Sequence, residues 1–294
     1  MPDGLVISLT SEGQEYQALQ GKDAREAARR LGVEIEVLFA EDNAVKQIQQ
    51  IFRHVHAPEE ERPTALLVHT RAPDGLERVA RNAARAGLGW LLLNRTAPYL
   101  EGLRAEHPGL AIGAVTTDHA AIGLIHARQL ARLCPDRSPV LYVQGPPDAA
   151  AARLRLEGFE QALRGRGYEL KVINGEWTAE SGEKAVTGWL RLRTSDLFRP
   201  AAIVCQNDLM ARGARAALEK NRPEWAGLPF LGCDGLAGSG RRDVDEGRLA
   251  GTVVIPSCAA PAVELAVKWS RGGGVPPLHT VLPPSAYPEE PAPG

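Results

Sequence analysis

The chain repeats one pattern along its length: a short apolar run, then Gly, Asn or Asp, then a longer stretch with apolar residues at helical spacing. Apolar runs of strand length lie at residues 5–9, 33–39, 65–69, 90–94, 111–115, 140–143, 170–173, 201–205, 229–232, 252–255 and 279–282. Helices are expected between them, at 18–31, about 45–55, 76–86, 118–133, 149–163, 182–192, 209–218 and 259–269. This alternation predicts an α/β protein with parallel sheets covered by helices on both faces.

Some of the expected helix ends carry explicit signals. Gly32 follows the first expected helix, and glycine at this position ends helices because it adopts the left-handed conformation readily. Asp42 or Asn43 is expected to cap the next helix, since both side chains accept hydrogen bonds from free backbone amides. The apolar residues of that helix recur at helical spacing: Val45, Ile48, Ile51, Phe52 and Val55.

The expected strands number about twice what one doubly wound domain requires, and 294 residues exceed the usual size of a single core. We therefore expect two doubly wound lobes, the first at residues 1–115 plus 257–277 and the second at 116–254 plus 278–294. The chain would cross between them three times, near 115–118, 254–257 and 274–278. The glycines at 272–274 are expected to give hinge freedom, and the proline-rich end from 283 is expected to be loose.

The composition excludes several classes of protein. Hydrophobic residues make up 44% and charged residues 24% of the chain, which is ordinary for a globular protein. The net charge of −2, with interleaved signs, argues against nucleic-acid binding. No apolar run approaches the ~20 residues needed to span a bilayer, so direct membrane insertion is not expected. We expect a periplasmic protein if a signal peptide is missing from this sequence, and a cytoplasmic one if the chain is complete as given.

The four cysteines do not form a metal-binding pattern. Cys134, Cys205, Cys233 and Cys258 include no C-x-x-C pair and have no histidine tract near them. An even number of cysteines does not by itself indicate disulfides in a chain of this size. We therefore expect free thiols that are buried or partly buried, no metal and no cofactor.

Polar side chains follow the expected strands at their carboxyl ends, which is the edge at which open α/β sheets bind ligands. They occur after five strands: Glu12, Gln14, Glu15 and Tyr16; Asn94 and Arg95; Gln144; Gln206, Asn207 and Asp208; and Asp234. Such side chains suit a ligand with many hydroxyl or amide groups. The alternative interpretation is that the asparagines and aspartates are turn residues and helix caps.

Several segments resemble the signatures of type 1 periplasmic binding proteins. Residues 202–214 resemble an apolar strand followed by N-D-x-x-A-x-G-A, and residues 232–235 resemble G-x-D-G. Residues 247–253 and 155–159 are similar to the family's G-x-L-A-x-T-V strand and R-x-x-G-F helix, and the matches run in order from residue 5 to about 282. The resemblance implies two hinged lobes and non-catalytic binding of a small polar ligand, a monosaccharide or sugar derivative, in the cleft between them.

The resemblance also implies which residues contact the ligand. The ligand-binding positions of ribose-binding members correspond here to Asn94, Arg95, Arg155, Asn207 and Asp234. Arginine offers a rigid fork of donors, an aspartate accepts from paired hydroxyls, and asparagine can do both. We expect these five side chains to converge on one cleft.

The sequence departs from the family pattern where that family has aromatic contacts. The first loop commonly carries stacking aromatics where this chain has Gln14 and Glu15, and Tyr16 is the only aromatic residue nearby. These three residues and Glu12 are expected to form one wall of the cleft.

Two further departures concern the second lobe. Ile255 replaces a glutamine on the return strand. Trp177 lies where the second lobe supplies an aromatic residue, and both stacking on a sugar face and packing as a partly buried tryptophan remain open for it.

The implied role is the solute-binding component of an ABC-type sugar transport system, with a membrane permease as partner. The alternative is a cytoplasmic ligand-sensing domain of a lactose-repressor-like regulator that lacks its DNA-binding segment and acts on another protein. An α/β enzyme is less favoured, because the sequence has no G-x-G-x-x-G after the first strand, no G-x-S-x-G and no phosphate-binding G-x-x-x-x-G-K-[ST].

Overall fold

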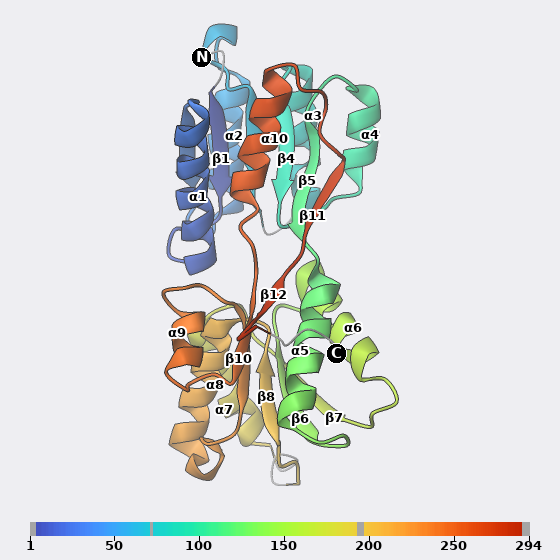
Figure 1. Ribbon diagram of the computed structural model, residues 1–294. Helices are drawn as coiled ribbons and strands as arrows, with labels where there is room; N and C mark the ends of the chain where they lie inside the picture. The colour runs from blue at the N-terminus through green and yellow to red at the C-terminus, as the bar shows by residue number, and fades with distance from the viewer. Residues whose placement is uncertain (1–3, 71–72, 193–196, 290–294) are drawn as a thin grey trace. The chain divides into compact units, whose positions relative to one another are not determined.

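A computed structural model describes residues 4–70, 73–192 and 197–289 (Figure 1). The chain divides into two compact units, Met1–Thr117 with Pro256–Leu282 and Asp118–Ile255 with Pro283–Gly294. It therefore passes from one unit to the other at 117/118, 255/256 and 282/283. Each unit contains one six-stranded sheet. The predicted class, α/β with two doubly wound lobes, is confirmed.

The sheet of the first unit is entirely parallel. Its strands, in the order in which they pair, are β11 (His279–Leu282), β5 (Ile112–Thr117), β4 (Gly89–Leu93), β3 (Ala65–Val68), β1 (Leu5–Leu9) and β2 (Ile35–Phe39). The central strands are buried along their whole length. This explains why they read as continuous apolar runs and not as an alternation of apolar and polar residues.

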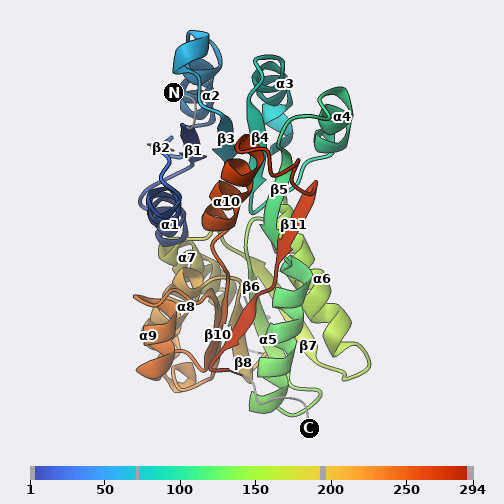
Figure 2. The same cartoon turned by 45° about the horizontal axis from the view of Figure 1, so that its top comes forward.

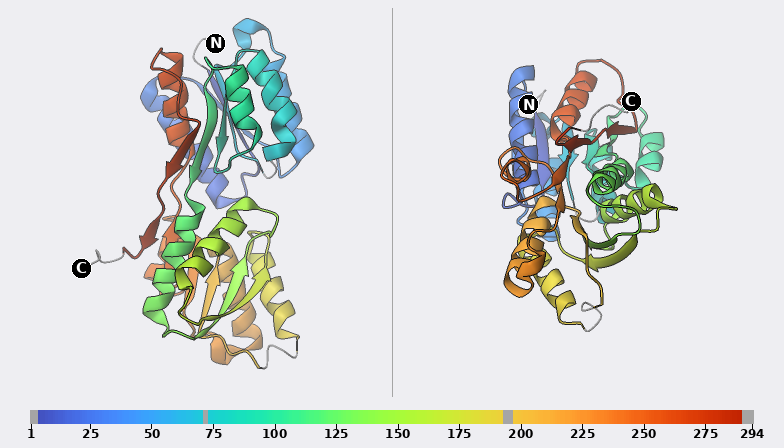
Figure 3. Two further views of the ribbon diagram at one scale, coloured as in Figure 1. Left: turned by 90° about the vertical axis from the view of Figure 1, so that its right-hand side faces the viewer. Right: turned by 60° about the horizontal axis from the view of Figure 1, so that its bottom comes forward.

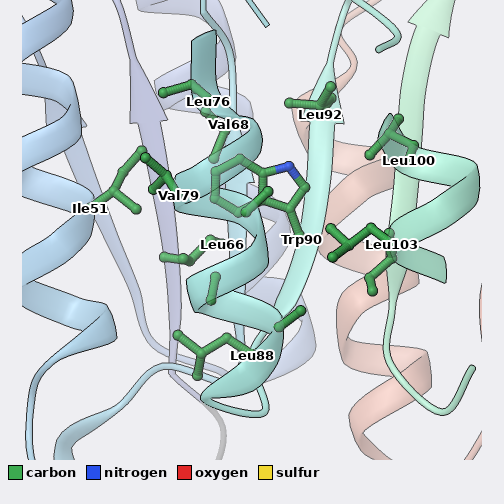
Figure 4. Packing of buried hydrophobic residues seen from close by; sticks show 14 of the residues in the cluster. Ile51, Leu66, Val68, Leu76, Val79, Leu88, Trp90, Leu92, Leu100 and Leu103 are labelled. Carbon is green, nitrogen blue, oxygen red and sulfur yellow. The ribbon is translucent and has the colours of Figure 1, made fainter. Parts of the chain in front are cut away.

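Helices cover both faces of that sheet: α1 (Glu15–Leu31) and α10 (Ala259–Ser270) on one face, and α2 (Ala44–Val55), α3 (Glu77–Arg85) and α4 (Tyr99–Glu106) on the other (Figure 2). Successive strand residues point to opposite faces, so Trp90 and Leu92 pack with α2–α4 while Leu91 and Leu93 pack with α1 and α10. Figure 4 shows Trp90 at the centre of the first of these clusters.

The sheet of the second unit is parallel except at one edge. Its order is β12 (Ser285–Tyr287), β10 (Gly251–Val254), β9 (Phe230–Asp234), β8 (Ala202–Cys205), β6 (Pro139–Gln144) and β7 (Glu169–Asn174), and β12 runs antiparallel to β10. Its helices are α5 (His119–Leu133), α6 (Ala150–Leu163), α7 (Ala179–Leu190), α8 (Asp208–Asn221) and the short α9 (Gly240–Asp245).

Neighbouring helices of the second unit approach closely because a glycine on one helix faces the backbone of the next. A Cβ on Gly123 of α5 would collide with the backbone of Arg155 and Phe159 in α6, and one on Gly213 of α8 would collide with the backbone of Ala179 and Glu183 in α7. Figure 3 shows α5 and α6 side by side. The glycines therefore set how tightly each helix pair packs.

The helix caps confirm the local signals of the sequence. Gly32 has a φ of 67° and ends α1, and the side chain of Asn43, not Asp42, accepts from the backbone N–H of Lys46 at the start of α2. Asp118 caps α5 in the same way, through the backbone N–H of Ala121.

One predicted boundary is wrong. We expected residues 278–282 in the second lobe, but β11 pairs with β5 in the first sheet. Gly113 permits this pairing, because a Cβ there would lie 2.7 Å from the carbonyl oxygen of Leu278. The third passage between units is therefore at 282/283 and not near 274–278. The glycines at 272–274 lie inside the first unit, where Gly272 and Gly273 donate to backbone carbonyls at the end of α10, so they are not at a hinge.

Three short elements differ from the expectations. Helices α4 and α9 were not among the expected helices, and residues 285–287 of the expected loose tail form β12. This strand is anchored by the Tyr287 hydroxyl, which donates to Asp245 at 2.7 Å. Pairing with an existing sheet edge stabilises a strand that is too short and proline-flanked to be recognised from its own sequence.

Candidate functional site

The predicted ligand residues of the second unit lie at or beside one edge of its sheet, formed by the carboxyl ends of the parallel strands. They are Arg155 in α6, Trp177 between β7 and α7, Asn207 at the start of α8 and Asp234 at the end of β9. We call this the carboxyl edge. The structure brings Trp177 into contact with both Arg155 and Asn207, and it places Asp234 on the strand next to β8.

Asn207 holds the local fold together. Its Oδ1 accepts from the backbone N–H of Met210 at 2.8 Å, and its Nδ2 donates to the carbonyl of Trp177 at 2.9 Å. The side chain thus acts as the cap of α8, as the alternative turn-and-cap interpretation predicts. The amide retains one further N–H and one further lone pair with which it can meet a ligand.

Arg155 is a buried cation, 4% exposed. Its Nη1 donates to the carbonyl of Gln206 at 2.6 Å, while its Nε has no hydrogen-bond partner among the described residues. Burial lowers the pKa of the neighbouring His126 to about 4, and repulsion from the positive charge of Arg155 acts in the same direction. A hydrogen bond to the Gly232 carbonyl opposes this shift. Arg155 therefore offers a free donor, its Nε–H, beside a histidine that burial keeps neutral.

Trp177 lies against Arg155. The guanidinium carbon is 5.4 Å from the centroid of the indole, within cation–π distance. The edge of the same ring sits over Gly145, where a Cβ would collide with three of its ring carbons. The tryptophan is half-buried, and it also packs against the core of the second unit. Packing, one of the two roles left open by the sequence, is thus observed.

Asp234 is held by a second, buried aspartate. Asp234 has a φ of 108°, and the backbone N–H of the following Gly235 donates to Oδ2 of Asp208 at 2.8 Å. Oδ1 of Asp208 accepts from the Thr252 hydroxyl at 2.6 Å. Burial, followed by the charge of Asp234, raises the pKa of Asp208 well above its usual range.

Gln206 organises the same edge, and its role was missed in the sequence. It is fully buried, its Oε1 accepts from the backbone N–H of Gly145, and its Nε2 donates to the Tyr142 hydroxyl and the Ala152 carbonyl. A glutamine directly after a buried strand was the available signal, but its partners come from β6 and α6. Ile255, the predicted replacement on the return strand, is buried.

In the first unit the predicted residues form two groups at the carboxyl edge. Asn94 and Arg95 follow β4, while the others lie in the loop after β1 and at the start of α1: Glu12, Gln14, Glu15 and Tyr16. Strand β3 separates β4 from β1 in the sheet. Glu12 and Glu15 are exposed, and Asn94 is half-buried with a φ of 57°. The hydroxyl of Tyr16 donates to the carbonyl of Pro256 at 3.0 Å, so it contacts the segment that re-enters this unit.

A buried polar cluster behind these groups was not predicted. The side chain of Gln17 lies 2.8 Å from Nδ1 of His69, and Nε2 of Gln47 donates to the Ser8 hydroxyl and to the His69 carbonyl. All four residues are buried. Glutamines on the inner faces of α1 and α2 were the sequence signal, and their positions at the carboxyl edge make them supports for the loops that follow β1 and β3.

The described residues contain no group of three or more His, Cys, Asp and Glu side chains arranged to hold a metal ion. The four cysteines are free and buried, as predicted, and burial raises the pKa of Cys258 to about 11. Within the described ranges, no helix has the length and apolarity needed to cross a membrane.

Comparison with known proteins agrees with this geometry. The family model described as "periplasmic binding protein domain" matches residues 5–268. The ribose import binding protein of Salmonella typhimurium is 26% identical over 274 residues, covering 92% of this chain and 86% of that protein. The Escherichia coli protein of the same name is 26% identical over 253 residues, covering 85% of this chain and 78% of its own length.

Solved structures share the fold. A periplasmic solute-binding protein of an ABC transporter from Actinobacillus succinogenes, with bound D-allose, superposes with a TM-score of 0.83 at 21% identity over 97% of this chain and 96% of that one. A solute-binding protein from Bacillus halodurans with bound myo-inositol gives 0.80 at 20% identity, covering 97% and 94%. The match of the family model over most of the sequence shows that the chain belongs to the periplasmic binding protein domain family.

Proposed function

We propose that this protein binds one sugar or related polyol, leaves it chemically unchanged and presents it to the membrane permease of an ABC-type importer. The proposal rests mainly on the carboxyl edge of the second sheet, where a buried arginine with a free Nε–H and the carboxylate of Asp234 occur together. Each hydroxyl of a polyol both donates and accepts, so a site that offers both kinds of partner suits it.

The relatives support the class of ligand. Proteins named for ribose import match most of the chain, and similar structures hold D-allose and myo-inositol. These ligands are small and uncharged and carry several hydroxyl groups. The family also favours the periplasm as the compartment in which the protein works.

The proposed ligand contacts come from both units. The principal ones are Asn94 and Arg95 in the first unit and Arg155, Asn207 and Asp234 in the second. Secondary contacts are proposed from the loop after β1 and the start of α1: Glu12, Gln14, Glu15 and Tyr16. Trp177, in the β7–α7 turn, is proposed to contribute to the same site. A ligand held by both units binds a closed arrangement more tightly than an open one, so it shifts the population towards closure. That closed state is the signal a permease reads.

Isothermal titration with D-ribose, D-allose and myo-inositol tests the proposal. A sugar present at a hundred times its Kd should stabilise the protein by about 2.7 kcal/mol. Asp234→Ala should weaken binding by about 1.5–3 kcal/mol, the scale of a hydrogen bond to a charged group. Asp136→Ala is the matched control, because Asp136 precedes β6 and pairs with Arg166 on the protein surface.

Small-angle scattering with and without the bound sugar tests closure. The radius of gyration should fall on saturation. Equal affinities of Asp234→Ala and the parent protein would remove Asp234 from the site. Steady chemical conversion of the sugar would instead indicate an enzyme.

A further inference from the structure

The backbone of Trp177 is held in an unusual conformation. Its φ of 67° lies in the left-handed region, which is strained for a bulky residue and persists only when neighbouring contacts enforce it. On the C-terminal side Thr178 caps α7 in a reciprocal capping box with Ser181. On the N-terminal side the backbone N–H of Glu176 donates to the Ser181 hydroxyl at 2.9 Å. The turn is thus fixed on both sides of the tryptophan.

Two further contacts fix where the indole goes. The carbonyl of Trp177 accepts from Nδ2 of Asn207 at 2.9 Å, which ties the turn to the start of α8. The ring then lies over Gly145, whose lack of a side chain leaves the space that the ring fills. Gly145 does not have a positive φ, so glycine is required at this position for room and not for backbone freedom.

The indole fixed in this way meets one charged group, the guanidinium of Arg155, at 5.4 Å. Arg155 is 4% exposed and its Nη1 is bonded to the Gln206 carbonyl. The guanidinium is therefore held at cation–π distance from the ring, and one of its N–H groups is bonded to a carbonyl. The orientation of the remaining donors follows from these two contacts.

We propose that Trp177 is a positioning residue for Arg155, and that Gly145 and Asn207 keep the indole where it can do this. The inference rests on the proposed function, since it assigns to Trp177 an effect on affinity that acts through the arginine and not through stacking on the sugar. Desolvated cation–π contacts are strong enough for such a role. Gly145 then determines affinity without touching the ligand.

A double-mutant cycle distinguishes positioning from direct contact. With the sugar that the parent protein binds, from D-ribose, D-allose and myo-inositol, Trp177→Ala and Arg155→Lys should each lower affinity about tenfold or more, which corresponds to about 1.4 kcal/mol. Trp177→Ala in the Arg155→Lys background should cost much less than in the parent background. Gly145→Ala, which displaces the ring but keeps it, should behave as Trp177→Ala does, and Trp177→Phe should restore part of the affinity.

The chain contains a matched control. Trp225 has the guanidinium of Arg222 above it, also at 5.4 Å, but it follows α8, away from the carboxyl edge. Trp225→Phe should leave the affinity within twofold of the parent value. Independent, additive effects of Trp177→Ala and Arg155→Lys would overturn the proposal, because they would show that the indole contacts the sugar itself.

A second measurement needs no sugar, so it separates this inference from the proposed function. The ring current of Trp177 should shift the Nε–Hε resonance of Arg155 in a nitrogen–proton correlation spectrum of the ligand-free protein. The shift should disappear in Gly145→Ala and Trp177→Ala and remain in Trp225→Phe. If no sugar binds but this pattern is found, the proposed function fails while the positioning role stands. An unchanged resonance in Gly145→Ala would refute the positioning role.

Discussion

At the scale of single residues, Asp208 shows how a side chain without an assigned role can define a site. Its carboxyl group joins the ends of three elements, since it accepts from Gly235 after β9 and Thr252 in β10 and lies at the start of α8. A Cβ at Gly232 or Gly240 would occupy the space of this carboxyl group. The backbone that carries Asp234 is therefore fixed by a buried acid.

We expect Asp208→Asn to change the pH dependence of stability. Burial first, and the charge of Asp234 second, raise the pKa of Asp208, so the folded protein holds this proton more tightly than the unfolded chain. Relative to Asp208→Asn, the free energy of unfolding of the parent protein should be level at low pH. It should fall as the pH rises above about 4, the ordinary value of an unfolded aspartate. Urea unfolding at a series of pH values measures this difference.

Asparagine is a suitable probe because its Oδ1 can accept from Gly235 while its Nδ2 donates to the Thr252 hydroxyl. The other charged groups near Asp208 are Asp234 and Asp243, and both stay in place in the variant. Asp148→Asn, at an exposed position before α6, is the control and should show no such trend. Parallel curves for Asp208→Asn and the parent protein would contradict the expectation.

The sequence identified the edge of the site better than the contacts within it. The polar residues that follow the strands could be predicted from the sequence, because parallel strands end at one edge of the sheet and helix caps follow them. The contact of Trp177 with Gly145 could not be predicted from the sequence. It joins the ends of two neighbouring strands, and it depends on a backbone conformation of Trp177 that no local sequence pattern indicates. Asn207 was readable both as a ligand and as a cap, and the structure shows the cap.

At the scale of elements, the packing of helix pairs in the second unit depends on which glycines face the backbone of a neighbouring helix. Gly213 faces the backbone of α7, and Gly188 on α7 faces open space. Both lie inside helices, where glycine is normally unfavourable because it gains more freedom on unfolding than alanine does. The same substitution should therefore have opposite effects at the two positions.

We expect Gly213→Ala to lower the free energy of unfolding by about 1–3 kcal/mol, the usual cost of overpacking. Gly188→Ala should raise it by about 0.5–1 kcal/mol, because alanine is the better helix former. Denaturant titration followed by circular dichroism compares the two variants with the parent. Destabilisation of similar size in both would contradict this, because it would show that the space beside each glycine does not decide the outcome.

The long elements were predictable and the short ones were not. Strands such as β4 are recognisable as continuous apolar runs, and helices such as α5 are long enough for their apolar residues to show a helical period. Helix α9, with six residues, and β12, with three, have no period to detect. Strand β11 was recognised as a strand, but its sheet was not, because the close approach that Gly113 allows depends on the partner strand.

At the scale of the whole molecule, neither unit is one continuous stretch of chain. The first unit is completed by α10 and β11, and the second by β12. Helix α10 contributes buried side chains to the core of the first unit, including Ala262, Val263 and Ala266. Strand β12 is only an edge strand of the second. The segment of α10 and β11 therefore contributes more to the stability of the first unit than β12 contributes to that of the second.

Truncation should expose this difference. A chain that ends after Leu282 loses β12 and its bond to Asp245, and we expect both units still to fold. A chain that ends after Ile255 loses α10 and β11, and we expect only the second unit to fold, because an uncovered apolar sheet face is not stable in water. Hydrogen exchange should show amides of β3 and β4 unprotected in the shorter chain while those of β6 and β8 stay protected. Protection of both sets would contradict this.

The placement of α10 and β11 also bears on the order of folding during synthesis. The ribosome releases residues 1–117 before residues 118–255, but the segment that completes the cover of their sheet, residues 256–282, emerges only after both. Residues 118–255 already contain all the parallel strands of their own sheet. Although domains generally fold in the order in which they are made, the half that is made first in this protein should be the half that folds last.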